Sequence, residues 1–253
     1  LFLYVFINLT SVAWLGALAI KQILGLPTIA GVILGMQVDM TLLTIILFFF
    51  VIAGIYSIYG GLASVAWTDV MQVTFLVGGG LITAYAALDV IASDLDISGG
   101  AFGALSEIYT NLIENPDDKH FNLVVTRNEA LYPNITDDPY FDIPGIVVIV
   151  GALWLTNLGY WGFNQYIIQK GLAAKSLAEA KKGMIFAAFL KILIPFIVCI
   201  PGVCAYFIMT SPECADLKAS LAGSLDRPDD AYPFLIRNFT PAFVKGLSFA
   251  ALA

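Results

Sequence analysis

Long apolar runs dominate this chain and decide what it can fold into. Five of them reach the roughly 20 mostly apolar residues that a helix needs to cross a bilayer, and a sixth begins near Phe243. This pattern favours an all-α polytopic membrane protein over a large soluble protein with buried helices. The predicted spans are residues 1–24, 40–59, 64–91, 144–168, 183–209 and 243–253.

The composition supports a membrane protein and excludes several other classes. Charged residues make up 12% of the chain, about half of the 25% typical of soluble domains. No basic patch is present to meet phosphates, so we expect no nucleic-acid binding. A single His and three Cys without metal-ligand spacing exclude His-ligated zinc chemistry. No nucleophile–base pair or phosphate-binding loop supports a membrane enzyme, so we predict that the protein is not an enzyme.

Both ends of the sequence lie in apolar segments, without a starting Met and without the basic start of a signal peptide. We therefore expect residues 1–253 to be a fragment of a single transmembrane domain in a longer protein.

The distribution of basic residues predicts the orientation in the membrane. The short connection at 169–182 is rich in Lys, and the positive-inside rule places such a loop in the cytoplasm. The 92–143 loop, which has ten Asp and Glu against two Lys and Arg, then lies on the extracellular or periplasmic side. A tight turn at "YGG" (59–61) returns to the cytoplasmic side.

Lys191 lies inside the predicted span 183–209, eight residues beyond Gly183 and therefore about 12 Å deep. A charge at that depth costs at least about 2.5–3.5 kcal/mol, so it needs a physical explanation. One explanation is a side chain that snorkels to the headgroups. The other is an ammonium that donates to ligand hydroxyls, or pairs with a carboxylate, in a wet cavity. Pro195 and Pro201 follow and are expected to distort the helix.

Asp69 raises the same question in the span 64–91, one or two turns beyond the "YGG" turn. It is either an interfacial residue in contact with water or a carboxylate along a cation exit path. Sequence chemistry leaves both interpretations open.

The stretch "NLGYWGFNQ" (157–165) places two Asn, a Tyr, a Trp and a Gln inside an apolar segment. Asn157, Tyr160, Trp161 and Asn164 are spaced i, i+3, i+4 and i+7, so on an α-helix they share one face. Amides suit sugar hydroxyls, and an aromatic plane suits the C–H face of a sugar. Interhelical hydrogen bonding and aromatic packing explain the same residues without a ligand.

Three stretches carry a family resemblance: "YSIYGGLASVAWTDVMQ" (56–72), "NLGYWGFNQYIIQ" (157–169) and "AAFLKILIPF" (187–196). They resemble the sodium/glucose and sodium/galactose cotransporters of the solute:sodium symporter family, in order and across nearly the whole chain. The resemblance implies a LeuT-type inverted-repeat helix bundle, of which this chain would hold core helices three to seven and the start of the eighth.

The resemblance also implies roles for individual residues. Asn157 and Lys191 match positions that hydrogen-bond the sugar, and Tyr160 matches the aromatic residue that stacks on it. Trp161 lies beside Tyr160 in this substrate site, and Asp69 matches an acidic residue implicated in sodium handling. The main sodium ligands are expected outside this chain.

Together these features predict a sodium-coupled sugar symporter that works by alternating access, with Na+ as the coupling ion. Its expected partners are a small sugar, sodium and the lipid bilayer, and its expected location is the plasma (cell inner) membrane. A sodium symporter for another solute, such as myo-inositol or a carboxylate, is one alternative. A transporter-like nutrient sensor is another.

Overall fold

The computed structural model describes residues 2–33, 35–114, 124, 127, 133–134, 145–221 and 230–252. The chain forms two compact units, one made of Leu1–Leu105 with Ile192–Ala253, and one made of Ser106–Lys191. We call them the first and the second unit and describe each by itself. Most of the predicted outer loop 92–143 beyond Glu114 lies outside the described residues.

Helices dominate the first unit. In the described part of the chain, three helical segments are long and apolar enough to cross a membrane: Phe6–Leu24, Met40–Asp94 and Leu177–Thr210. The first two lie in the first unit, and the third begins in the second unit. The elements of the first unit are α1 (Phe2–Leu24), β1 (Ala30–Ile33), β2 (Met36–Asp39), α2 (Met40–Asp94), α9 (Ile194–Thr210), η4 (Pro212–Cys214), α10 (Ala215–Ser220), α11 (Ala231–Phe239) and α12 (Ala242–Leu252). A further helix, α3 (Gly100–Glu114), begins in this unit.

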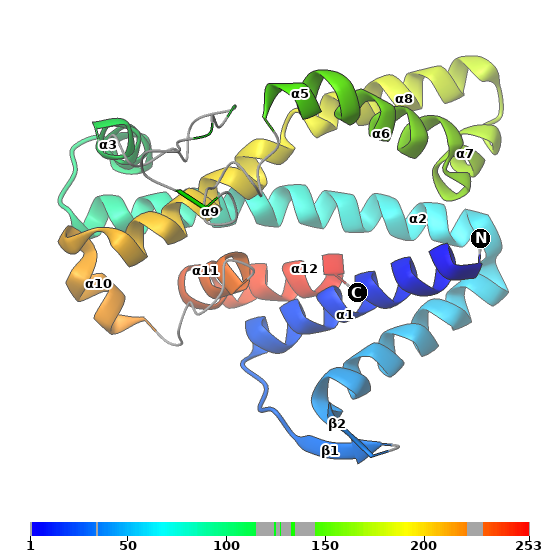
Figure 1. Cartoon of the computed structure of the whole chain (residues 1–253), viewed down its shortest axis with the longest axis horizontal. Helices are drawn as coiled ribbons and strands as arrows, with labels where there is room; N and C mark the ends of the chain where they lie inside the picture. The colour runs from blue at the N-terminus through cyan, green and yellow to red at the C-terminus, as the bar shows by residue number, and fades with distance from the viewer. Residues whose placement is uncertain are drawn as a thin grey trace. The chain divides into compact units, whose positions relative to one another are not determined.

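The 55 residues of α2 hold both predicted spans 40–59 and 64–91, and the backbone leaves the helical conformation between them at Gly61. Gly61 has φ 55° and ψ −154°, a combination that is essentially restricted to glycine. The helix therefore turns back on itself at its middle, as Figure 1 shows, inside the predicted "YGG" turn.

A two-stranded hairpin between α1 and α2 departs from the all-α prediction. β1 and β2 are antiparallel, and Ala30 pairs with Asp39 while Ile33 pairs with Met36. Gly35 in the turn has φ +81°, which glycine adopts without steric cost. Each strand has four residues, the shortest length at which an alternating pattern identifies a strand, and only β2 alternates apolar and polar residues, since β1 has no polar side chain.

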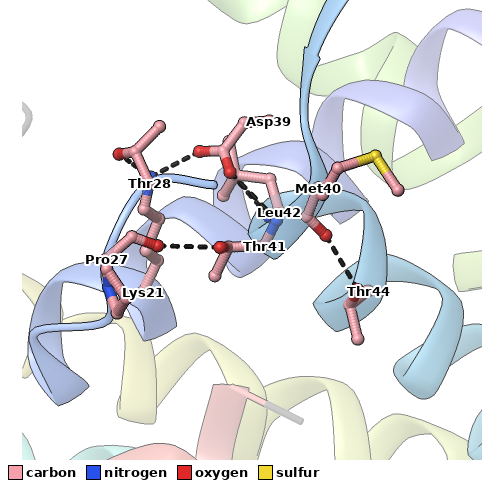
Figure 2. A network of polar contacts seen from close by, with 8 residues as sticks. All are labelled: Lys21, Pro27, Thr28, Asp39, Met40, Thr41, Leu42 and Thr44. Atoms are coloured by element: carbon pink, nitrogen blue, oxygen red, sulfur yellow. Dashed lines mark hydrogen bonds and ion pairs between the residues drawn. The ribbon is translucent and has the colours of Figure 1, made fainter. Parts of the chain in front are cut away.

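A polar cluster fixes the hairpin between the end of α1 and the start of α2 (Figure 2). One carboxylate oxygen of Asp39, Oδ1, accepts from the backbone N–H of Thr41 at 3.0 Å and so caps α2. The other, Oδ2, accepts from Lys21 Nζ, which also donates to Thr28 Oγ1 at 2.6 Å. The Lys21 and Asp39 side chains are only 12% and 18% exposed, so this ion pair is shielded from solvent.

The core of the first unit lies where the second half of α2 packs against α9 and α12 (Figure 1). A Cβ atom on Gly80 would lie 2.2 Å from Ile197 Cγ2, so α2 and α9 approach each other closely only because this residue is glycine. The buried side chains of this region include Ala84, Ala87, Leu88, Ile91, Ile197, Phe207 and Ile208. The first half of α2 instead exposes Phe48, Val51 and Ile55, as a lipid-facing surface does.

The second unit begins inside α3, at Ser106, and beyond position 144 its described part is a series of short helical pieces followed by one longer helix. The pieces are α5 (Ile146–Val148), η2 (Ile149–Leu153), α6 (Trp154–Leu158), η3 (Gly159–Phe163) and α7 (Gln165–Leu172), and the longer helix is α8 (Leu177–Lys191). Ser176 caps α8, because its hydroxyl accepts from the Glu179 N–H at 3.2 Å. The predicted loop 169–182 is therefore mostly helical, and only residues 173–176 lie between α7 and α8.

Candidate functional site

The segment from Gly145 to Leu172 carries most of the predicted site residues, and it is not one regular helix. Two stretches, η2 and η3, are π-helical, and Asn164 between η3 and α7 is extended, with φ −78° and ψ 117°. β-Branched residues fill positions 146–150 and glycines stand at 159 and 162, so the intrinsic helix propensity is low here. Short π-helices often occur at functional sites.

These irregularities correct one sequence prediction. Asn157 lies in α6, Tyr160 and Trp161 lie in η3, and Asn164 lies outside any helix. The four residues therefore do not share one α-helical face, since that face requires 3.6 residues per turn throughout. The backbone carbonyl of Asn164 instead accepts from the Ile168 N–H at 3.0 Å and starts α7.

Three of the four predicted substrate residues nevertheless meet in the second unit. The Lys191 ammonium lies 4.2 Å from the centroid of the Trp161 ring and 5.9 Å from that of Tyr160. The two rings stand edge to face, with centroids 5.5 Å apart and planes at 83°. Both cation–ring distances are within the range of cation–π attraction. Tyr160 is 43% exposed in this chain.

Lys191 reaches the rings because it is the last residue of α8. The chain leaves the α-helical conformation at residues 192 and 193 and re-enters it at Ile194, with Pro195 in the first turn of α9. Proline is favoured in a first turn, where the backbone N–H has no helical partner. The predicted distortion of the Lys191 helix thus takes the form of an interruption directly after Lys191.

Asn157 lies one turn before the ring pair and is exposed. Its side-chain amide donates to the Leu153 carbonyl at 2.9 Å, four residues earlier. This bond uses one of the two N–H donors of the amide. Its second N–H donor takes no partner among the described residues.

Asp69 lies in the first unit, half-buried in α2 and eight residues beyond the Gly61 turn. Tyr160, Trp161 and Lys191 all lie in the second unit. Among the described residues, no group of three or more His, Cys, Asp and Glu side chains is placed to hold a metal ion.

The Lys21–Asp39 pair is the polar feature that sequence analysis missed. An Asp directly before an apolar run, such as Asp39, is a sequence signal for a helix N-cap. The ion pair across 18 residues has no comparable signal, because it depends on the hairpin. The hydrogen bond from Lys21 holds the pKa of Asp39 below its usual value.

Comparison with known proteins identifies the family. The model of the sodium:solute symporter family matches residues 1–253. The chain belongs to this family. The family resemblance noted in the sequence is thereby confirmed.

The relatives of this chain include sodium cotransporters for glucose and for myo-inositol. The sodium/glucose cotransporter of Vibrio parahaemolyticus is 44% identical over 99% of this chain, which covers 41% of that relative. The sodium/myo-inositol cotransporter 2 of Homo sapiens is 29% identical, and the sodium/glucose cotransporter 4 of Mus musculus is 28% identical, each over the whole of this chain and 34% of the relative. The chain therefore spans about two-fifths or less of the length of these relatives.

Proposed function

We propose that this symporter carries a small sugar across the plasma (cell inner) membrane together with Na+, by alternating access. The 44% identity to a sodium/glucose cotransporter is the observation that carries the proposal. The cluster of two aromatic rings and one ammonium supports it, because a sugar needs an apolar plane for its C–H face and donors for its hydroxyls.

The proposed architecture is a LeuT-type inverted-repeat helix bundle, of which this chain holds core helices three to eight. Such transporters bind substrate at helices that are interrupted near the middle of the membrane, where freed backbone groups face a cavity. The two π-helices and the extended residue Asn164 give the segment 145–172 this interrupted character.

In the proposed site, the Lys191 ammonium and the Asn157 amide donate to sugar hydroxyls, and the sugar stacks on Tyr160. Trp161 lies beside them as part of the site. Asp69 lies on the cytoplasmic route by which sodium leaves. The main sodium ligands belong to helices outside this chain.

The test is uptake by the full-length protein in liposomes. An inward sodium gradient should drive accumulation of radiolabelled glucose, and an equal potassium gradient should not. One sodium ion falling through 100 mV supplies about 2.3 kcal/mol, and a tenfold concentration gradient adds about 1.4 kcal/mol. At one-to-one coupling these terms support an accumulation of roughly several hundred-fold. Uptake that is equal in sodium and potassium would contradict the proposal.

A symporter for myo-inositol is the second candidate, and it is favoured by the relatives of that name at 28–30% identity. Sodium-dependent uptake of myo-inositol without glucose uptake would select it. A carboxylate as the solute would instead appear as uptake of an anionic substrate. A nutrient sensor would bind sugar with sodium but move neither across the membrane.

A further inference from the structure

The Lys191 ammonium lies at different distances from the rings of Trp161 and Tyr160. The ammonium is 4.2 Å from the Trp161 centroid and 5.9 Å from the Tyr160 centroid, so Trp161 makes the closer contact. Trp also attracts cations more strongly than Tyr does. The ring planes differ by 83°, so one flat sugar face cannot lie against both rings at once.

We propose that Trp161 is a positioning residue, which holds the Lys191 ammonium over its ring, while the sugar stacks on Tyr160 alone. This inference rests on the proposed function, since it divides the roles within that same site. Trp161 then acts on the sugar through Lys191 and not by direct contact.

The two aromatic rings are the contacts recorded for the Lys191 ammonium among the described residues, and Trp161 is the nearer of them. Within the described part of residues 145–191, Lys191 forms no ion pair, whereas Lys182 on the same helix pairs with Glu179 at 2.9 Å. A lysine side chain has four rotatable bonds and loses much freedom when it is fixed. An ammonium that is already held at the site before the sugar arrives lowers this cost of binding.

The first experiment needs no ligand. The purified full-length protein is treated with limiting acetic anhydride, and acetylation at Lys191 relative to Lys182 is measured by mass spectrometry. Trp161→Leu should raise this ratio by about two- to thirty-fold, the range that a cation–π contact supplies, and Trp161→Phe should raise it less because a ring remains. Trp154→Leu is the matched control, since Trp154 is an exposed tryptophan of the same segment. An unchanged ratio in Trp161→Leu overturns the proposal.

The second experiment is a double-mutant cycle on equilibrium binding of radiolabelled glucose and myo-inositol. Trp161→Leu should weaken binding in the parent protein but cause no further loss when Lys191→Met is already present. Equal losses in both backgrounds would mean that Trp161 contacts the sugar itself, and would overturn the proposal. Trp161→Phe should recover part of the affinity. If the parent binds neither sugar, the proposed function fails, while the acetylation ratio still decides whether Trp161 holds Lys191.

Discussion

At the scale of single residues, Lys191 carries the strongest prediction. Loss of a hydrogen bond made by a charged group costs about 1.5–3 kcal/mol, or roughly ten- to a hundred-fold in affinity. Lys191→Ala should therefore weaken sugar binding by that factor, and Asn157→Ala by less. Tyr160→Phe keeps the stacking plane and should be tolerated better than Tyr160→Ala. The measurement is equilibrium sugar binding to purified full-length variants.

Lys182→Ala is the control for this series, because Lys182 is exposed on the same helix and its ion pair is with Glu179, which is also exposed. It should leave the sugar affinity within about twofold of the parent, since an exposed ion pair is worth little. An unchanged affinity in correctly inserted Lys191→Ala would mean that the lysine only snorkels to the headgroups, and would falsify the site in which Asn157, Tyr160 and Lys191 contact the sugar.

Asp69 is predicted to act on sodium and not on the sugar. Asp69→Asn keeps the size of the side chain and removes its charge, so sugar binding at equilibrium should stay within about twofold. The rate of transport or its dependence on sodium concentration should change, because the charge lies on the proposed exit route. The two quantities are measured by sugar binding and by uptake over a range of sodium concentrations. A variant equal to the parent in both assigns Asp69 to the membrane interface.

Asp39 caps α2 and pairs with Lys21, and substitutions can separate these two interactions. Asp39→Asn keeps an oxygen that can cap α2 but loses the ion pair with Lys21, whereas Asp39→Ala loses both. The thermal stability of the purified protein should therefore fall in the order parent, Asn variant, Ala variant. Equal stability of the Asn and Ala variants would mean that the cap contributes nothing.

The same carboxylate predicts a pH dependence. Its pKa is lowered in the folded protein, chiefly by the hydrogen bond from Lys21. The stabilisation is therefore fully present above the ordinary pKa of 3.8 and is lost as the pH falls through the lower folded value. Curves of melting temperature against pH should keep a constant separation between the parent and Asp39→Asn at higher pH, and should draw together as the pH falls below 3.8. Curves that stay parallel would contradict this linkage.

At the scale of elements, the turn inside α2 depends on one residue. No neighbouring atom blocks a Cβ on Gly61, so the cost of Gly61→Ala comes from the backbone conformation alone, at about 1–3 kcal/mol. Gly54→Ala is the matched control, because Gly54 lies in the helical part of α2 and also has room for a Cβ. Thermal unfolding should show a loss for Gly61→Ala and none for Gly54→Ala. Equal effects would mean that the turn does not need glycine.

The segment 145–172 shows where prediction by periodicity fails at this scale. Its length and hydropathy predict a helix, and most of its residues are indeed helical. Periodicity assumes 3.6 residues per turn, whereas π-helices and an extended residue each shift the register of everything that follows. The spacing of Asn157 and Asn164 therefore did not predict their relation in space.

At the scale of the whole molecule, the orientation in the membrane stays a prediction with a direct test. Cysteine placed at Ala174, between α7 and α8, should react with a membrane-impermeant thiol reagent only from the cytoplasmic side. Cysteine placed at Ser98, between α2 and α3, should react only from the opposite side. Cys199 is exposed and should first be replaced by Ser. The reverse labelling pattern would overturn the orientation and the placement of the Asp69 exit route.

The sequence by itself determined the class of protein and the chemical types at its site. Apolar runs of about 20 residues have one good environment, the bilayer, so composition and length predict membrane helices without any tertiary information. A lysine, a tyrosine and a tryptophan in such runs are conspicuous for the same reason, since the bilayer penalises polar groups. The family follows from residue order and identity, and these too are properties of the sequence.

Only the tertiary structure decided how these residues meet. Lys191 and Trp161 are 30 positions apart, and their contact depends on the path of the chain through α7 and α8, which no local pattern encodes. The Lys21–Asp39 pair likewise exists because the hairpin of β1 and β2 returns the chain to the end of α1. Sequence patterns predict helix periods and caps, whereas contacts between distant segments depend on the packing of the whole unit. The different distances of Trp161 and Tyr160 from Lys191 are therefore known only from the tertiary structure.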